Sequence, residues 1–148
     1  MLFNENKIYL IQSDTTAGFV SKDYRAINAL KGRDEDTLCV ITTNSFASLK
    51  KLARIPLAHK NLIRRAKKSS FIYANKLCIR VSKDSEYNAF LANFSGAWAY
   101  SSSANAHGAD FNQKWARQKA DEIIGSNFSP SAPSSIYRLG KTGFKKLR

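Results

Sequence analysis

Short apolar runs of β-forming residues alternate along this chain with short stretches of helical pattern, and this alternation restricts its fold more than any other feature. We expect strands at 7–12, 37–42, 97–101 and 135–139, and a hairpin from 71–73 and 77–81. Helices are predicted over 21–30, 45–53, 57–68, 84–93 and 112–124. Such a pattern is typical of an α/β domain with a twisted, mixed open sheet flanked by helices. The 148 residues suffice for one domain, 1–148.

A lysine and an arginine stand on either side of a glycine at the end of the first predicted helix. Ser21 is the expected N-cap of that helix, and Gly32 lies just past its end. Lys31 and Arg33 are therefore placed to close together on a phosphate. The alternative is that both cations only complement the helix dipole.

A run of hydroxyls and one amide, Tyr100 to Asn105, directly follows the apolar segment 96–99, which contains Trp98. Small polar side chains at the end of a strand pack poorly but offer many hydrogen-bonding groups. We expect this run to form the floor of a ligand site, while a plain serine-rich turn is the simpler reading. Trp98 and Trp115 are expected to pack in the core, and His59 to be solvated.

The charge balance favours anionic partners. Lysine and arginine number 24 against 11 aspartates and glutamates, which gives a formal charge of +13. An excess of this size attracts polyanions such as RNA, although a basic, solubilising surface accounts for it equally well. No apolar segment is long enough to span a membrane and no secretory signal opens the chain, so a cytoplasmic location is expected. Cys39 and Cys78 lie in apolar runs and are predicted to be buried free thiols, with no metal site.

Five segments in order carry a resemblance. They are Ser13 to Phe19, Lys31-Gly32-Arg33, Ile79-Arg80-Val81, Ser102 to Gly108, and Ser134-Ser135-Ile136. This series resembles the YrdC/YciO family, whose pattern reads P-T-[DE]-T-x-Y-G-L, K-G-R-P, v-R-v-P, S-T-S-A-N-x-S-G and S-T-I-V. The chain departs from it at Gln12, Ala17, Asp34 and Ser82, and at 66–70. The match is collinear and spans almost the whole chain.

The resemblance implies a YrdC-like fold and a nucleotidyltransferase, L-threonylcarbamoyladenylate synthase. Such an enzyme joins L-threonine, bicarbonate and ATP, with Mg²⁺ accompanying the ATP and no tightly bound cofactor. Its product passes to downstream proteins that form threonylcarbamoyladenosine on tRNA. The expected ATP-binding residues are Lys31, Arg33, Lys76, Asn105 and Arg148. The expected threonine-binding residues are Thr15, Arg80, Ser103 and Ser134, and no side chain is needed as a covalent nucleophile.

Three alternatives stay open at this point. Arg80 is expected to receive the threonine carboxylate in a bidentate pair, but Asp84 is a possible structural partner for it. A non-catalytic RNA-binding paralogue would use Arg64-Arg65, Lys67-Lys68 and Lys145-Lys146. A related enzyme would carry out carbamoyl-adenylate chemistry on another acceptor. In the synthase reading, tRNA or double-stranded RNA is bound only weakly and without sequence preference.

Overall fold

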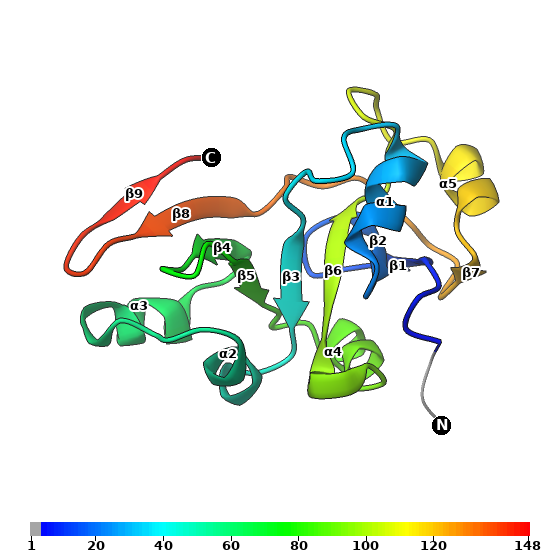
Figure 1. The fold of residues 1–148 in the computed structure, drawn as a ribbon. Coiled ribbons are helices and arrows are strands. Elements are labelled where there is room, and N and C mark those ends of the chain that lie inside the picture. The colour runs from blue at the N-terminus through cyan, green and yellow to red at the C-terminus, as the bar shows by residue number, and fades with distance from the viewer. Residues whose placement is uncertain (1–3) are drawn as a thin grey trace.

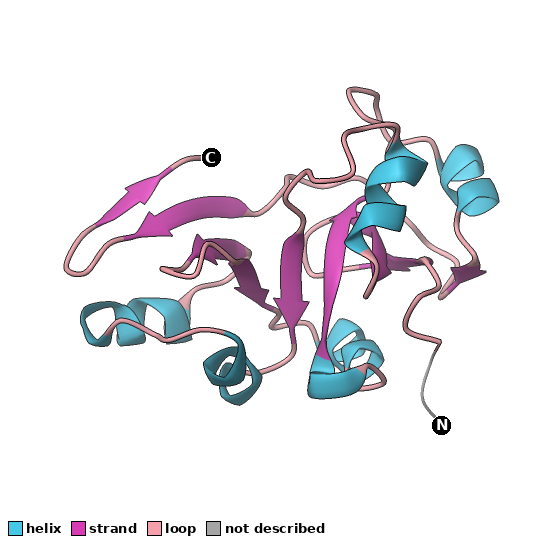
Figure 2. Ribbon diagram, viewed as in Figure 1, coloured by secondary structure: helices cyan, strands magenta, loops and turns pink. Residues whose placement is uncertain are grey.

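A nine-stranded mixed sheet forms the centre of the computed structural model, which describes residues 4–148 (Figures 1 and 2). The strands are β1 (Tyr9–Gln12), β2 (Ala17–Ser21), β3 (Val40–Thr43), β4 (Ser69–Ile72), β5 (Cys78–Val81), β6 (Trp98–Ser103), β7 (Glu122–Ile123), β8 (Ser135–Leu139) and β9 (Phe144–Lys146). The helices are α1 (Tyr24–Lys31), α2 (Phe46–Leu52), α3 (Lys60–Arg65), α4 (Ser85–Leu91) and α5 (Gln113–Lys119), with the short 3-10 helices η1 (Leu57–His59) and η2 (Ser95–Ala97). The expected α/β class is confirmed.

The strand order is β7-β1-β2-β6-β3-β5-β4-β8-β9. Parallel pairs join β1 to β7, β3 to β5 and β4 to β8, and the other neighbours are antiparallel. The β4–β5 pair confirms the predicted hairpin. As a result, segments distant in sequence lie side by side in the middle of the sheet, where β6 is held between β2 and β3.

Strand β2 was not predicted, and the expected cap at Ser21 was wrong. All five residues of β2 are buried between β1 and β6, so the strand shows no polar-apolar alternation. Ser21 is the last residue of that strand. Asp23 caps α1 instead, because its side chain accepts a hydrogen bond from the backbone N–H of Ala26. The predicted end of the helix is confirmed, since Gly32 has a φ of 77°.

Two helices are shorter than predicted. The segment 57–68 forms η1 and α3, after which the chain extends toward β4. The predicted helix 112–124 ends at Lys119, and β7 follows. The competing interaction is pairing with β1: the backbone N–H groups of Asp121 and Ile124 donate to the carbonyls of Ile8 and Leu10. Edge pairing therefore overrides the helical pattern in this segment.

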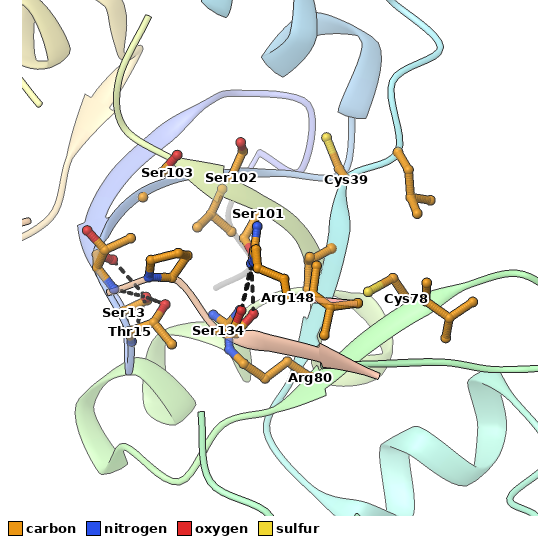
Figure 3. A pocket seen from close by; sticks show the side chains of 18 of the residues that line it. Ser13, Thr15, Cys39, Cys78, Arg80, Ser101, Ser102, Ser103, Ser134 and Arg148 are labelled. Carbon is orange, nitrogen blue, oxygen red and sulfur yellow. Dashed lines mark hydrogen bonds between the residues drawn. The ribbon is translucent and has the colours of Figure 1, made fainter. Parts of the chain in front are cut away.

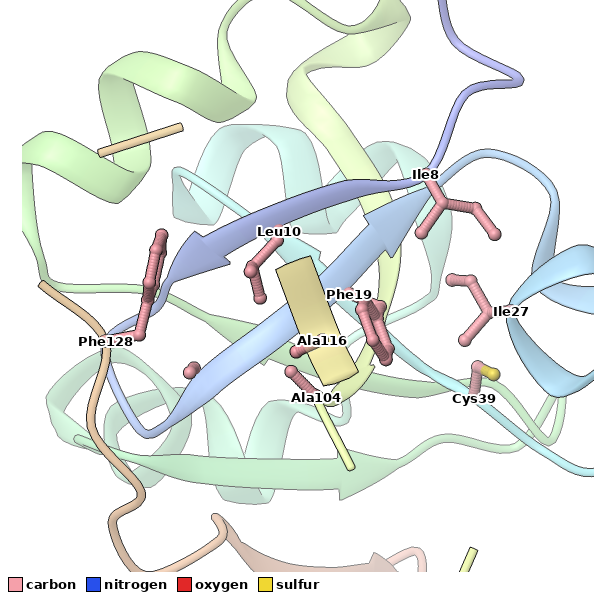
Figure 4. Packing of buried hydrophobic residues seen from close by; sticks show 9 residues of the cluster. Ile8, Leu10, Phe19, Ile27, Cys39, Ala104, Ala116 and Phe128 are labelled. Carbon is pink, nitrogen blue, oxygen red and sulfur yellow. The ribbon is translucent and has the colours of Figure 1, made fainter. Parts of the chain in front are cut away.

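Helices cover both faces of the sheet and bury three apolar clusters. In one of them, Leu10 and Phe19 from β1 and β2 pack with Ile27 of α1 and Ala116 of α5 (Figure 4). A second cluster lies between β1 and α4, and a third lies under α2 and α3. Trp115 contacts the ring of Phe19, in agreement with its expected packing role.

The basic C-terminal segment also forms a strand, which the sequence did not indicate. Strand β9 pairs with the predicted strand β8, and this hairpin packs against η1. The expectation that His59 is solvated was wrong. Only 4% of His59 is exposed, because its ring packs edge-on against Phe144 and its Nε2 lies 3.1 Å from the carbonyl oxygen of Gly140.

Candidate functional site

A cavity of about 210 Å³ opens where the ends of β2, β5, β6 and β8 meet (Figure 3). Its walls combine hydroxyls, three arginines, two thiols and several aliphatic side chains. The lining residues are Ser13, Thr15, Thr16, Gly18, Val20, Arg33, Leu38, Cys39, Val40, Ile72, Cys78, Arg80, Ser101, Ser102, Ser103, Pro133, Ser134, Ile136 and Arg148. A concave site with a few converging charges is the usual form of a small-molecule site.

The turn between β1 and β2 presents two hydroxyls to the cavity. Ser13 Oγ accepts hydrogen bonds from the backbone N–H groups of Thr15 and Thr16, and it donates to the carbonyl of Thr16. Its oxygen also lies 3.2 Å from Thr15 Oγ1. These short local bonds fix the turn without long side chains, so Thr15 is held in a defined position at the cavity wall.

The serine run forms the last part of β6, where it pairs with β2. Ser101, Ser102 and Ser103 of the predicted run line the cavity, whereas Tyr100, Ala104 and Asn105 are not among its lining residues. Gly18 of β2 stands opposite Ser103, and a Cβ added to it would lie 3.1 Å from the Ser102 carbonyl oxygen. Close approach of the two backbones therefore favours glycine at this position.

Arg33 reaches the cavity from the end of α1. Its Nε donates to Asn28 Oδ1 at 2.7 Å, and its Nη2 donates to Ser102 Oγ at 3.1 Å. These contacts aim a fixed cation at the serine run. The two predicted segments, 31–33 and 100–105, are therefore brought together by the fold.

Lys31 lies beside Arg33 but does not line the cavity. Its Nζ donates to the backbone oxygen of Ser103 and lies 3.4 Å from Asn105 Oδ1. Burial, with a smaller contribution from Arg33, lowers the pKa of Lys31 to about 8. Asn105 also donates to the carbonyls of Ala106 and Ala109, so both predicted ATP-binding residues here shape the loop after β6.

Arg80 lies under the cavity in a buried ion pair with Asp14. Its Nε and Nη2 contact the carboxylate at 3.0 to 3.2 Å, and the two side chains are 5% and 7% exposed. The suggested partner Asp84 is instead the N-cap of α4. One edge of the Arg80 guanidinium already binds Asp14. A ligand carboxylate can therefore accept hydrogen bonds only from the remaining N–H groups of the guanidinium.

Strand β8 and the C-terminal Arg148 form the remaining wall. The hydroxyls of Ser134 and Ser70 lie 2.7 Å apart, and Arg148 donates from Nε and Nη2 to the Ser134 carbonyl at 3.0 and 2.8 Å. Partial burial lowers the pKa of Arg148 from its ordinary value. Lys76, by contrast, is an exposed turn residue outside the cavity wall.

Two thiols, Cys39 and Cys78, line the cavity together with aliphatic side chains that include Ile72 and Ile136. Cys39 and Cys78 are both buried and free, as predicted. Burial raises the pKa of Cys78 to about 11 and also raises that of Cys39, so both are neutral thiols. Within residues 4–148, no group of three or more His, Cys, Asp or Glu side chains is placed to hold a metal ion.

Sequence reasoning missed several elements of this site, above all Asp14 and the thiols. Nothing in the local sequence assigns a partner to Asp14, because its ion pair with Arg80 joins residues 66 apart. The position of the thiols depends on the parallel pairing of β3 and β5, which no local pattern reveals.

No protein-family model matches the chain, and no curated protein matches its sequence. Solved structures do match it. A Sua5 structure from P. abyssi in complex with L-threonine superposes with a TM-score of 0.76 at 18% identity, over 96% of this chain and 50% of that one. E. coli YciO superposes with a TM-score of 0.76 at 12% identity, over 97% and 82% of the two chains. Full-length HypF in a phosphate- and nucleotide-bound form gives 0.75 at 11% identity, over 96% and 26%.

These likenesses define the fold as YrdC-like, which confirms the expected architecture. The chain spans about half the length of the Sua5 structure that it matches. In the part of the chain from residue 4 onward, no helix has the length and apolar character that crossing a bilayer requires.

Proposed function

We propose that this chain is an L-threonylcarbamoyladenylate synthase of the YrdC/YciO family, acting in the cytoplasm. The observation that carries the proposal is the cavity, in which Arg33, Arg80 and Arg148 surround clustered serine and threonine hydroxyls. Two further facts support it. A protein of the same fold has been solved with L-threonine, and another with phosphate and nucleotide.

The reaction requires two bonds to form. The threonine nitrogen attacks the carbon of bicarbonate, and water and a proton leave, so that a carbamate results. A carbamate oxygen then attacks the α-phosphorus of ATP, and the bond to the β-phosphate oxygen breaks with release of pyrophosphate. Because the second step joins two anions, the site must hold the reactants close together and neutralise charge, and it needs no covalent nucleophile.

Different walls of the cavity bind the amino acid and neutralise the charge of the phosphates. Thr15, Ser103 and Ser134 offer hydroxyls to a small zwitterion, and its carboxylate meets the free part of the Arg80 guanidinium. Arg33 and Arg148 face the phosphates of ATP, to which Mg²⁺ is bound as part of the substrate. A volume of about 210 Å³ suits an amino acid better than a complete nucleotide, so the nucleotide extends along the rim.

In this proposal, Lys31 and Asn105 do not contact the substrates. Lys31 holds the backbone of Ser103, and Asn105 closes the following loop. They position the serine run. Lys76 takes no part.

Pyrophosphate release from ATP by the full chain tests the proposal. Release should require both L-threonine and bicarbonate, and omission of either should reduce it to the rate without enzyme. Mass spectrometry of the product distinguishes threonylcarbamoyl-AMP from an adduct of another acceptor. A chain that binds ATP but releases no pyrophosphate with threonine and bicarbonate present would overturn the proposal.

A further inference from the structure

Asn28, in the last turn of α1, is completely buried, and both polar atoms of its side chain are hydrogen-bonded. Its Nδ2 donates to the backbone carbonyls of Glu35 and Thr37 at 2.8 and 2.9 Å, and its Oδ1 accepts from Arg33 Nε at 2.7 Å. These partners define the orientation of the amide, because carbonyls face its nitrogen and an N–H faces its oxygen. One buried side chain therefore joins the helix, the turn that follows it and an arginine of the cavity.

Three acidic residues directly follow Arg33 in sequence, yet none of them neutralises it. The carboxylates of Glu35 and Asp36 contact the Arg25 guanidinium at 4.0 and 3.1 Å, and the first of the three acids accepts a hydrogen bond from a backbone N–H of the same turn. Within residues 4–148, no ion pair involves Arg33. Because the amide of Asn28 holds the backbone of this acidic turn, the carboxylates stay directed at other partners.

Arg33 differs in this respect from Arg80, the buried arginine of the same cavity. Arg80 is oriented by the Asp14 carboxylate, which also cancels its charge. Arg33 is oriented by neutral groups only, since its Nε donates to Asn28 and its Nη2 donates to Ser102 Oγ and to a thiol. In the part of the chain that the structure describes, its Nη1 donates to no protein group. A full positive charge and two N–H groups of Arg33 are therefore left for a ligand.

We propose that Asn28 is a positioning residue for the binding of ATP. It orients Arg33 through a neutral amide and holds the acidic turn away from the guanidinium, so that the arginine meets the phosphates with its charge intact. Asn28 does not line the cavity and acts only through Arg33. This role rests on the ATP site of the function proposed above.

Two substitutions separate the orientation of Arg33 from its charge. Asn28→Ala leaves the charge but releases the side chain, whereas Asn28→Asp keeps an acceptor for Arg33 Nε and cancels the charge. Isothermal titration calorimetry of the full chain with Mg²⁺ and ATP, without threonine and bicarbonate, measures both. Asn28→Ala should weaken ATP about two- to tenfold, the scale of one hydrogen bond. Asn28→Asp should also weaken ATP and, unlike Asn28→Ala, should make the remaining affinity less sensitive to salt.

A double-mutant cycle distinguishes positioning from general support of the fold. In the Arg33→Ala background, Asn28→Ala should leave ATP affinity unchanged, because the side chain through which Asn28 acts is already absent. Asn88→Ala is the control, since it removes an amide that holds the Ser82 carbonyl on α4, and it should bind ATP as the wild type does. Circular dichroism establishes that each variant is folded, and Asn28→Ser replaces Asn28→Ala if the latter is not.

Equal weakening by Asn28→Ala in the wild-type and Arg33→Ala backgrounds would overturn the proposal, because Asn28 would then act on the fold as a whole. Unchanged affinity in the wild-type background would overturn it as well. A wild-type chain that binds no ATP would overturn this role together with the proposed function. A chain that binds ATP but releases no pyrophosphate contradicts the synthase activity alone, and the cycle then still supports or overturns the role of Asn28.

Discussion

Asp14 and Arg80, 66 residues apart in sequence, form a buried ion pair that ties the β1–β2 turn to strand β5 beneath the cavity. Nε and Nη2, on one edge of the Arg80 guanidinium, both donate to the Asp14 carboxylate. Such charge-assisted contacts are about twice as strong as hydrogen bonds between neutral groups. The ion pair also neutralises Arg80, so this arginine does not present an uncompensated positive charge to the cavity. A ligand that enters the cavity meets an arginine whose orientation is already fixed.

Removing the carboxylate should destabilise the protein strongly. Asp14→Asn leaves the Arg80 charge buried without compensation, a situation that costs about 3–5 kcal/mol. Urea unfolding followed by circular dichroism measures the loss. The double substitution Asp14→Leu with Arg80→Met removes both charges and should recover most of the stability. If the single variant unfolds at the wild-type denaturant concentration, the pair is not a structural element.

Arg33 should contribute to ATP affinity, whereas Lys76 should not. Arg33 faces the cavity in a fixed orientation, and Lys76 stands on an exposed turn outside its wall. Arg33→Ala should weaken ATP by about 1.5–3 kcal/mol, the scale of a charge-assisted hydrogen bond. Isothermal titration calorimetry decides the matter, with Lys76→Ala as the control of equal charge change. Equal losses in the two variants would remove Arg33 from the site.

Stability should depend on pH through Lys31. Its pKa is about 8 in the folded protein and 10.5 without burial, so the unfolded chain binds more protons between these values. Relative to Lys31→Met, the wild-type protein should therefore gain stability as the pH rises from about 8 to 10.5, by at most about 3 kcal/mol. Unfolding free energies measured across this window test the sign. A difference that is constant with pH would show that Lys31 is not desolvated.

His59 should be required for the docking of the β8–β9 hairpin. His59→Ala removes the contact with the Gly140 carbonyl and the edge-on packing against Phe144. The expected loss is about 1–3 kcal/mol, because the substitution removes a part-buried hydrogen bond and the packing of a buried ring. His107→Ala changes an exposed histidine and serves as the control in the same thermal unfolding experiment. The prediction fails if the two variants melt alike.

The sequence predicted those helices and strands whose local pattern is not overridden by contacts with distant segments. The helix predicted over 45–53 corresponds to α2, and the predicted end of α1 at Gly32 is also present in the structure. The serine run and the Lys31–Arg33 pair were each predicted to contribute to ligand binding, and the fold brings them into contact. Their roles toward ATP and threonine stay predictions.

Other features depend on partners that the sequence does not reveal. Strand β2 is buried on both faces and contains a glycine needed for backbone approach to β6, so it lacks the usual alternation. Strand β7 forms because β1 has a free edge, and His59 is buried because the β8–β9 hairpin covers it. Arg80 pairs with Asp14 and not with Asp84, which is nearer in sequence, because Asp84 is the N-cap of α4. Each of these outcomes is decided by contacts between distant segments.

The parallel pairing of β8 with β4 has a consequence for how the cavity is assembled. Pro133, Ser134, Ile136 and Arg148 supply one wall of the cavity, whereas β2, β5 and β6, which supply other walls, end at or before Ser103. This wall therefore depends on contacts between segments distant in sequence, and such contacts form slowly because a long loop must close first. A chain whose β8 has not yet paired with β4 lacks this side of the cavity.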